Sequence, residues 1–71
     1  MELRHIRYFK AIAEEKNFTK AAEKLAIAQP PLSRPIQDLE AELGTPLFIR
    51  SPHKVTLTEE GELFLQYASQ I

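Results

Sequence analysis

The sequence contains no cysteine, so neither a disulfide framework nor a cysteine-based metal site supports this chain of 71 residues. It has no apolar run that approaches the ~20 residues of a membrane span, and Met1 leads into a charged helical pattern rather than a signal peptide. Internal repeats, low-complexity segments and a glycine-rich phosphate loop are also missing. We therefore expect one cytoplasmic globular domain with no membrane partner, no metal and no cofactor.

The chain also lacks a net positive charge, because nine Lys and Arg stand against ten Asp and Glu, giving −1. The charges are nevertheless divided by position. All nine bases lie in residues 1–54 together with seven acids, which gives +2, whereas residues 55–71 hold three acids and no base, which gives −3. The distribution of charge decides nucleic-acid binding more than its sum does, so such a partner is not excluded.

Residues 28–44 have the pattern of one amphipathic helix, because each residue advances about 100° around a helix axis. One narrow arc is apolar and is expected to face the core; it contains Leu32, Ile36, Leu39 and Leu43. Another arc carries donors and acceptors that suit base edges and phosphates; it contains Gln29, Pro30, Ser33, Arg34 and Gln37. An ordinary surface helix, whose outer face is polar only because it meets water, has the same pattern. The neighbouring elements must decide whether this face is merely solvated or binds nucleic acid.

Two helical segments precede this long helix. Residues 2–16 are amphipathic, and Arg4, Arg7 and Lys10 are expected on their solvated face, with His5 isolated and inert. Thr19 is expected to cap a short helix that packs against the long one, and a phosphate at the same helix end is an equally open role.

Residues 26–28 leave room only for a tight turn, so the two helices form a helix-turn-helix unit. In that arrangement the N-terminal part of the second helix enters the major groove. We call residues 30–43 the reading helix.

Two β-prone segments follow Gly44, which is expected to end the reading helix. Residues 45–50 and 54–57 are joined by Ser51-Pro52-His53 and predict a hairpin, with Arg50, His53 and Lys54 at or near its tip. A hairpin in this place is the wing of a winged helix.

The last helix is expected to begin at Thr58, whose hydroxyl can cap it, with Glu59 and Glu60 complementing the helix dipole. Gly61 lowers helix propensity and therefore indicates close packing. An apolar stripe then runs to the end of the sequence, typical of a core face or of an interface with a second copy; it consists of Leu63, Phe64, Tyr67, Ala68 and Ile71.

Over its whole length the sequence resembles the N-terminal DNA-binding domain of LysR-type transcriptional regulators. The segments that carry the resemblance are residues 1–9, 18–22, 28–34, 39–44, 46–50 and 55–61. The sequence Gln-Pro-Pro-Leu-Ser-Arg at residues 29–34 is especially similar to the corresponding segment of regulators of aromatic-compound catabolism. The resemblance implies a mainly α winged helix-turn-helix with three helices, a hairpin wing and the start of a linker helix.

The resemblance also implies a function. Such a bacterial regulator binds double-stranded DNA at an interrupted inverted repeat, lies on the nucleoid when bound, and is not an enzyme. Residues 1–57 would form the DNA-binding domain and residues 58–71 the start of a dimerisation helix, while the family's effector-binding domain is absent, so no small-molecule effector is expected here. Because the apolar stripe is cut at Ile71, we expect a homodimer weakened by truncation, or a monomer.

By the same resemblance, a set of residues at the start of the reading helix would face DNA: Gln29, Pro30, Pro31, Ser33, Arg34 and Gln37. Arg pairs with guanine, Gln with adenine, and a proline ring can lie against a thymine methyl. Thr19 and Arg50 would contact the DNA backbone, and His53 and Lys54 would make the wing contacts.

Three residues depart from the family pattern. Pro35 stands inside the expected reading helix, where a proline costs about 3 kcal/mol and kinks the chain. Ala28 replaces a capping residue, and His53 replaces an Arg that would suit the minor groove, which makes Lys54 the better wing contact. These departures keep a second interpretation open: a winged-helix protein-interaction module with weak or lost DNA binding. An enzyme is disfavoured, since Ser33 has no base at motif spacing.

Overall fold

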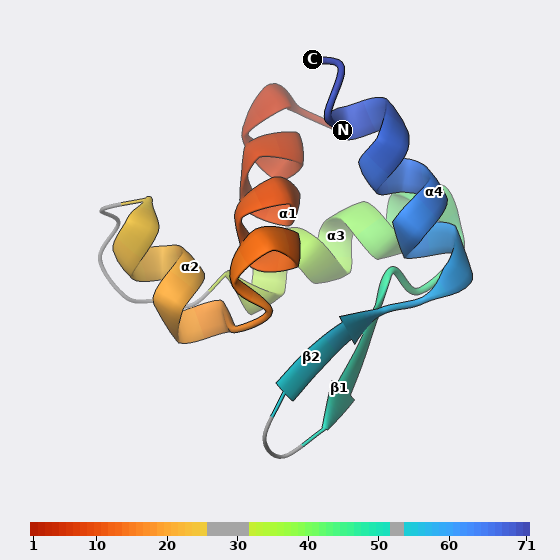
Figure 1. Ribbon diagram of the computed structural model, residues 1–71. Helices are drawn as coiled ribbons and strands as arrows, with labels where there is room; N and C mark the ends of the chain where they lie inside the picture. The colour runs from red at the N-terminus through yellow and green to blue at the C-terminus, as the bar shows by residue number, and fades with distance from the viewer. Residues whose placement is uncertain (26–31, 52–53) are drawn as a thin grey trace.

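The computed structural model of the chain describes residues 1–25, 32–51 and 54–71. Its elements are, in order, α1 (Leu3–Glu15), α2 (Phe18–Lys24), α3 (Ser33–Leu43), β1 (Phe48–Ser51), β2 (Lys54–Leu57) and α4 (Glu59–Ala68). The four helices form one body from which the β1–β2 hairpin projects (Figure 1). This order confirms the expected winged helix-turn-helix with a further helix at the end. No helix in the described ranges is long and apolar enough to cross a bilayer.

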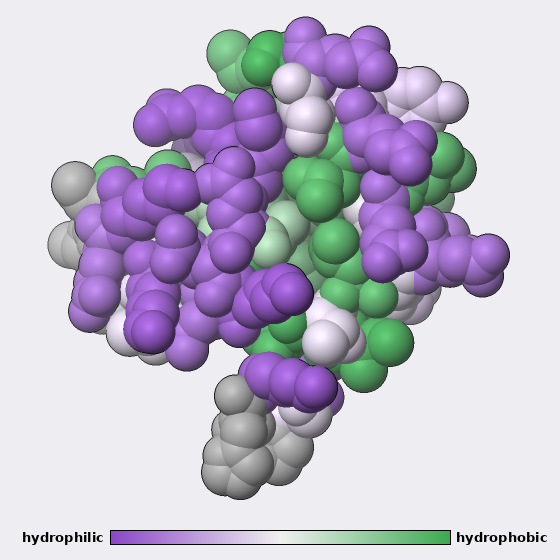
Figure 2. Space-filling view, viewed as in Figure 1, coloured by the Kyte–Doolittle hydropathy of each residue, from purple (hydrophilic) through white to green (hydrophobic). Residues whose placement is uncertain are grey.

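Every element contributes buried apolar side chains to one core. Phe9, Ile12, Ile36 and Leu39 are at most 1% exposed, and no polar residue among those described is buried. Leu43 was expected in the core stripe of the long helix, but it is the last residue of α3 and is 37% exposed. Apolar side chains also reach the surface between α1 and α4 (Figure 2).

The start of α2 differs from the expectation. Asn17, not Thr19, is the N-cap, and its Oδ1 accepts a hydrogen bond of 2.8 Å from the Lys20 amide. Asn is as good a cap as Thr and stands in the extended conformation that a cap requires, so Phe18 and Thr19 already lie inside the helix. The prediction was that α2 packs against α3. Instead α2, with Ala21 and Ala22 buried, packs mainly against α1.

The described part of α3 begins at Ser33, with Leu32 as its N-cap. Pro35 is therefore the third helical residue, and the first main-chain bond of the helix runs from the Ile36 amide to the Leu32 carbonyl at 3.2 Å. Pro35 was expected inside the helix, but it lies in the first turn of the described part, where amides have no partner in the helix. Gly44 ends α3 with a φ of 76°, as predicted. The expected weak cap at Ala28 lies outside the described residues.

The hairpin is fixed to α3 and α4 at its base. β1 and β2 are antiparallel, with Phe48 opposite Leu57 and Ser51 opposite Lys54. Glu40 of α3 accepts hydrogen bonds at Oε2 from the amides of Leu47 and Phe48, at 2.6 and 3.2 Å. This one carboxylate therefore sets where β1 starts.

The start of α4 confirms both predictions made for it. The Thr58 hydroxyl accepts a hydrogen bond of 2.9 Å from the Gly61 amide and donates one of 2.8 Å to the Pro46 carbonyl. Gly61 is buried, and a Cβ built on it would lie 2.1 Å from the Leu47 carbonyl oxygen. Only glycine fits at this contact between α4 and the residue before β1.

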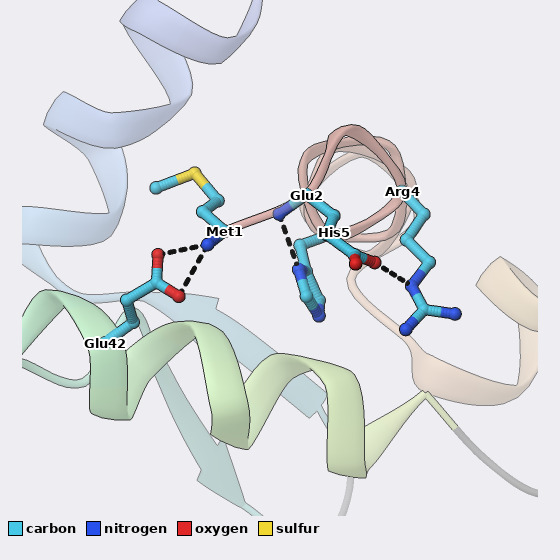
Figure 3. Close-up of polar contacts among 5 residues, drawn as sticks. All are labelled: Met1, Glu2, Arg4, His5 and Glu42. Carbon is cyan, nitrogen blue, oxygen red and sulfur yellow. Dashed lines mark hydrogen bonds and ion pairs between the residues drawn. The ribbon is translucent and has the colours of Figure 1, made fainter.

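The start of α1 is held by polar contacts that the sequence did not indicate (Figure 3). The Met1 amino group pairs with Glu42 of α3, and Arg4 Nε lies 2.7 Å from Glu2 Oε1. His5 is not inert, because its Nδ1 accepts a 2.9 Å hydrogen bond from the Glu2 amide. This bond satisfies one of the unpaired amides at the helix start.

Candidate nucleic-acid interface

The solvent-facing side of α3 carries the described part of the predicted reading surface. The Arg34 side chain is 83% exposed, Gln37 is exposed, and Ser33 is half-buried. The Arg34 guanidinium pairs with Asp38 one turn later, with Nε 3.3 Å from Oδ1. An exposed pair of this kind contributes little free energy, so another acceptor can replace Asp38. Gln29, Pro30 and Pro31 lie outside the described residues.

Arg50 lies where three elements meet. From β1 its guanidinium carbon reaches 4.3 Å from the centroid of the Phe18 ring at the start of α2. Its Nη1 donates a hydrogen bond of 3.3 Å to the Ser33 hydroxyl at the start of α3. Arg50 lies near the hairpin tip, next to the last described pair of the hairpin, and its side chain folds back onto the helix-turn-helix unit.

The other predicted backbone contacts fall into two places. Thr19 is exposed in the first turn of α2, the residue after Phe18 in sequence. Lys54 is exposed at the start of β2, opposite Ser51 in the last described pair of the hairpin. His53 lies outside the described residues.

Lys24, another basic residue of the helix-turn-helix unit, forms ion pairs with two acidic residues of α1. Its Nζ donates a hydrogen bond of 2.5 Å to Glu14 Oε1 and lies 3.6 Å from Glu15 Oε2. The hydrogen bond with Glu14 raises the pKa of Lys24 and lowers the pKa of the Glu14 carboxyl. The pair connects α1 and α2 at the surface of the domain.

The predicted dimerisation residues of α4 divide into two groups. Ala68 is 1% exposed, and Phe64 packs edge-to-face on Phe9 with ring centroids 5.0 Å apart, so both belong to the core. Leu63, Tyr67 and Ile71 are 53%, 63% and 66% exposed. A shallow, mainly apolar hollow of about 220 Å³ lies beside them; it is lined by Leu43, Thr45, Leu47, Glu60, Leu63, Phe64 and Tyr67.

Comparison with known families identifies this arrangement. Residues 3–62 match the family described as bacterial regulatory helix-turn-helix protein, lysR family. The chain belongs to the LysR family. As in other members, the domain is the DNA-binding part of a transcriptional regulator and not an enzyme.

Individual LysR-family relatives agree with this assignment. Over 71 residues the chain is 61% identical to the regulator BenM of Acinetobacter baylyi and 55% identical to CatR of Pseudomonas putida. All of this chain is covered in both matches, but only 23% of BenM and 24% of CatR. The predicted resemblance to regulators of aromatic catabolism is confirmed.

A solved structure gives the same result for the fold. The crystal structure of a BenM_DBD/catB site 1 DNA complex superposes with a TM-score of 0.92 at 61% identity. The match covers 99% of this chain and 79% of the solved one.

Two residues of this LysR-family interface were missed. Asp38 lies four residues after Arg34 on the same helix, a spacing at which opposite charges pair, so the sequence contained that signal. No role of its own was predicted for Phe18. Its contact with Arg50 spans 32 residues of sequence, and no local pattern reports a contact of that kind.

Proposed function

We propose that this LysR-family domain binds double-stranded DNA carrying an interrupted inverted repeat, with the start of α3 in the major groove and the hairpin along the adjacent backbone. Residues 1–57 would make the contacts, and residues 58–71 would begin the helix that joins two copies. The observation that supports this most directly is the meeting of the exposed α3 face, Arg50 and the first turn of α2. A regulator of this kind works in the bacterial cytoplasm, on nucleoid DNA.

The proposed contacts follow from side-chain chemistry. Arg34 would donate to guanine, Gln29 and Gln37 would pair with adenine, and the rings of Pro30 and Pro31 would lie against thymine methyl groups. Ser33 would also face the DNA, at the edge of the groove. Contacts to the DNA backbone would fix position without selecting sequence; they would come from Thr19, Arg50, His53 and Lys54.

Binding to the catB site 1 duplex of the BenM complex tests the proposal, with a scrambled duplex as the comparison, at several salt concentrations. A parallel selection from randomised duplexes covers the case in which this domain prefers another operator. We expect a preference for one inverted repeat together with a steep fall of affinity with salt, because bound phosphates release counterions. Salt-dependent binding without any sequence preference would contradict specific recognition.

Arg34→Ala separates DNA reading from the alternative of a protein-interaction module. Loss of a bidentate contact to guanine is expected to weaken binding to the preferred duplex by roughly 10-fold or more. Arg7→Ala, the same change at an exposed position of α1, is the control and should have a much smaller effect. Equal affinities of both variants and the wild type would reject Arg34 as a base-reading residue.

We further propose that two copies pair through α4. Leu63 and Tyr67 support this, because their apolar side chains are exposed four residues apart on α4, and Ile71, beyond the end of the helix, is exposed as well. Leu63 and Tyr67 line the same apolar hollow as Leu43, and exposed apolar patches commonly mark protein–protein interfaces.

A further inference from the structure

Arg50 joins three elements that are distant in sequence. It belongs to β1, its guanidinium lies over the Phe18 ring of α2 at 4.3 Å, and its Nη1 hydrogen-bonds the Ser33 hydroxyl of α3 at 3.3 Å. A guanidinium within about 6 Å of a ring centroid is attracted by the negative face of the ring. Its planar shape lets one face stack while its edge still donates hydrogen bonds. We call Phe18, Arg50 and Ser33 the clasp.

The position of the Phe18 ring is fixed by its packing against core residues. It meets Phe48 edge-to-face, with centroids 6.0 Å apart and planes at 69°. Phe48 in turn contacts Phe9, which is fully buried, at 5.2 Å. Arg50 therefore stacks on a ring whose position the core determines, rather than on a mobile surface side chain.

The other end of the clasp is a helix start with little support of its own. Ser33 is the first residue of α3, and the N-cap Leu32 offers no side-chain hydrogen bond. Glu40 fixes the hairpin base near the C-terminal end of α3, whereas Arg50 contacts the start of the same helix. The two attachments together set the angle between the hairpin and the start of α3.

We propose that Phe18 and Arg50 are positioning residues for sequence discrimination, because the clasp holds the hairpin and the start of α3 in one fixed relation. The inference rests on the proposed function and adds a specific role for a residue with no DNA-contacting chemistry, Phe18. Base contacts depend on exact aim within the groove, whereas phosphate contacts tolerate small shifts. Loosening the clasp therefore lowers discrimination more than it lowers total affinity.

Four variants test the clasp. Phe18→Leu removes the ring, and Phe18→Tyr keeps it. Arg50→Lys keeps the charge but removes the planar group. Ile12→Val is the control, because it trims a fully buried side chain of α1 outside the clasp.

The first readout is the NMR spectrum of the free protein. Ring current from Phe18 is expected to shift the side-chain protons of Arg50 in the wild type, in Phe18→Tyr and in Ile12→Val, and not in Phe18→Leu. The second readout is the ratio of the dissociation constants for scrambled and preferred duplexes. Phe18→Leu should lower that ratio roughly two- to fivefold, with affinity for scrambled DNA unchanged, while Phe18→Tyr and Ile12→Val keep it. Arg50→Lys should lower the ratio as well, and because Arg50 is also a proposed backbone contact its affinity for scrambled DNA is not used as a criterion.

Three outcomes would overturn the inference. If the Arg50 side-chain signals are the same in Phe18→Leu as in the wild type, Arg50 does not stack on Phe18 and the clasp does not form. An unchanged ratio in Phe18→Leu, or an equal loss of affinity for both duplexes, would reduce Phe18 to a structural residue. A wild type without sequence preference would contradict the proposed function, and the role in discrimination would fall with it, whereas the NMR measurement would still decide whether the clasp forms.

Discussion

Pro35 occupies a place in α3 where its missing amide removes no helical hydrogen bond. It is the third residue of the helix, and the first main-chain bond begins one residue later, at Ile36. A proline in the first turn is tolerated, and its ring restricts the unfolded chain. The cost of about 3 kcal/mol that applies to interior prolines is therefore absent here.

Replacement of Pro35 by Gln tests this position. We expect the free energy of unfolding to fall by about 0.4 to 1 kcal/mol, because the unfolded chain gains freedom. Urea unfolding followed by circular dichroism measures the change, with Pro46→Gln as the matched loop substitution. A gain in stability of about 3 kcal/mol would mean instead that Pro35 breaks the helix.

At Gly61, helix propensity favours a larger residue, whereas close packing excludes one. Alanine favours a helix over glycine by about 0.8 to 1.0 kcal/mol, but its Cβ would lie 2.1 Å from the Leu47 carbonyl oxygen. That oxygen also accepts a hydrogen bond of 3.0 Å from the Thr58 amide, so it cannot move freely.

Gly61→Ala is therefore expected to destabilise the domain, by about 1 to 3 kcal/mol, since overpacking exceeds the gain in propensity. Thermal and urea unfolding measure the effect. Gln66→Ala, at an exposed position of the same helix, changes propensity alone and should be close to neutral. A Gly61→Ala variant as stable as the wild type would show that α4 and Leu47 can separate.

At the scale of elements, one carboxylate joins α3 to the hairpin. Glu40 Oε2 accepts from two successive amides, those of Leu47 and Phe48. Such charge-assisted bonds contribute more than neutral ones, and amides left without a partner at a partly buried site add a further cost.

Glu40→Ala is expected to lower the free energy of unfolding by about 1.5 to 3 kcal/mol, and Glu40→Gln by less, because an amide oxygen still accepts. Hydrogen exchange at the Leu47 and Phe48 amides should rise along with the loss. Glu42→Ala is the control on the same helix, since it removes only a surface pair with the Met1 amino group. If Glu40→Ala behaves like Glu42→Ala, the hairpin base is held by packing alone.

Local patterns predicted most of these elements and fewer of their contacts. The helical and β-prone segments, the turn at Gly44 and the cap at Thr58 all depend on neighbours within a few residues, so the sequence indicated them. Asn17 and Thr19 are both good caps, and only the backbone conformation decides between them. The partner of α2 and the contact between Arg50 and Phe18 depend on how distant elements pack, which no local pattern contains.

At the scale of the whole molecule, the core and the outer surface of α4 have separate roles. Phe64 and Ala68 pack inward and hold α4 on the domain, so the helix presents Leu63 and Tyr67 in a fixed arrangement. The proposed DNA-contacting residues lie on α3, α2 and the hairpin and not on this side of α4. Pairing through α4 would therefore leave both DNA-binding surfaces of a dimer exposed, as binding to two half-sites requires.

Leu63→Lys tests the pairing, because a charge in an apolar interface must lose its hydration. Sedimentation over a range of concentrations is expected to show weak, concentration-dependent association of the wild type and a monomer for Leu63→Lys. Ser69→Lys adds the same charge at another exposed position of the C-terminal region and should associate like the wild type. Association that persists in Leu63→Lys would place the interface elsewhere, and a tight wild-type dimer at low concentration would contradict the expected weak pairing. Because pairing doubles the number of DNA contacts, Leu63→Lys should also weaken binding to an inverted repeat more than binding to a single half-site.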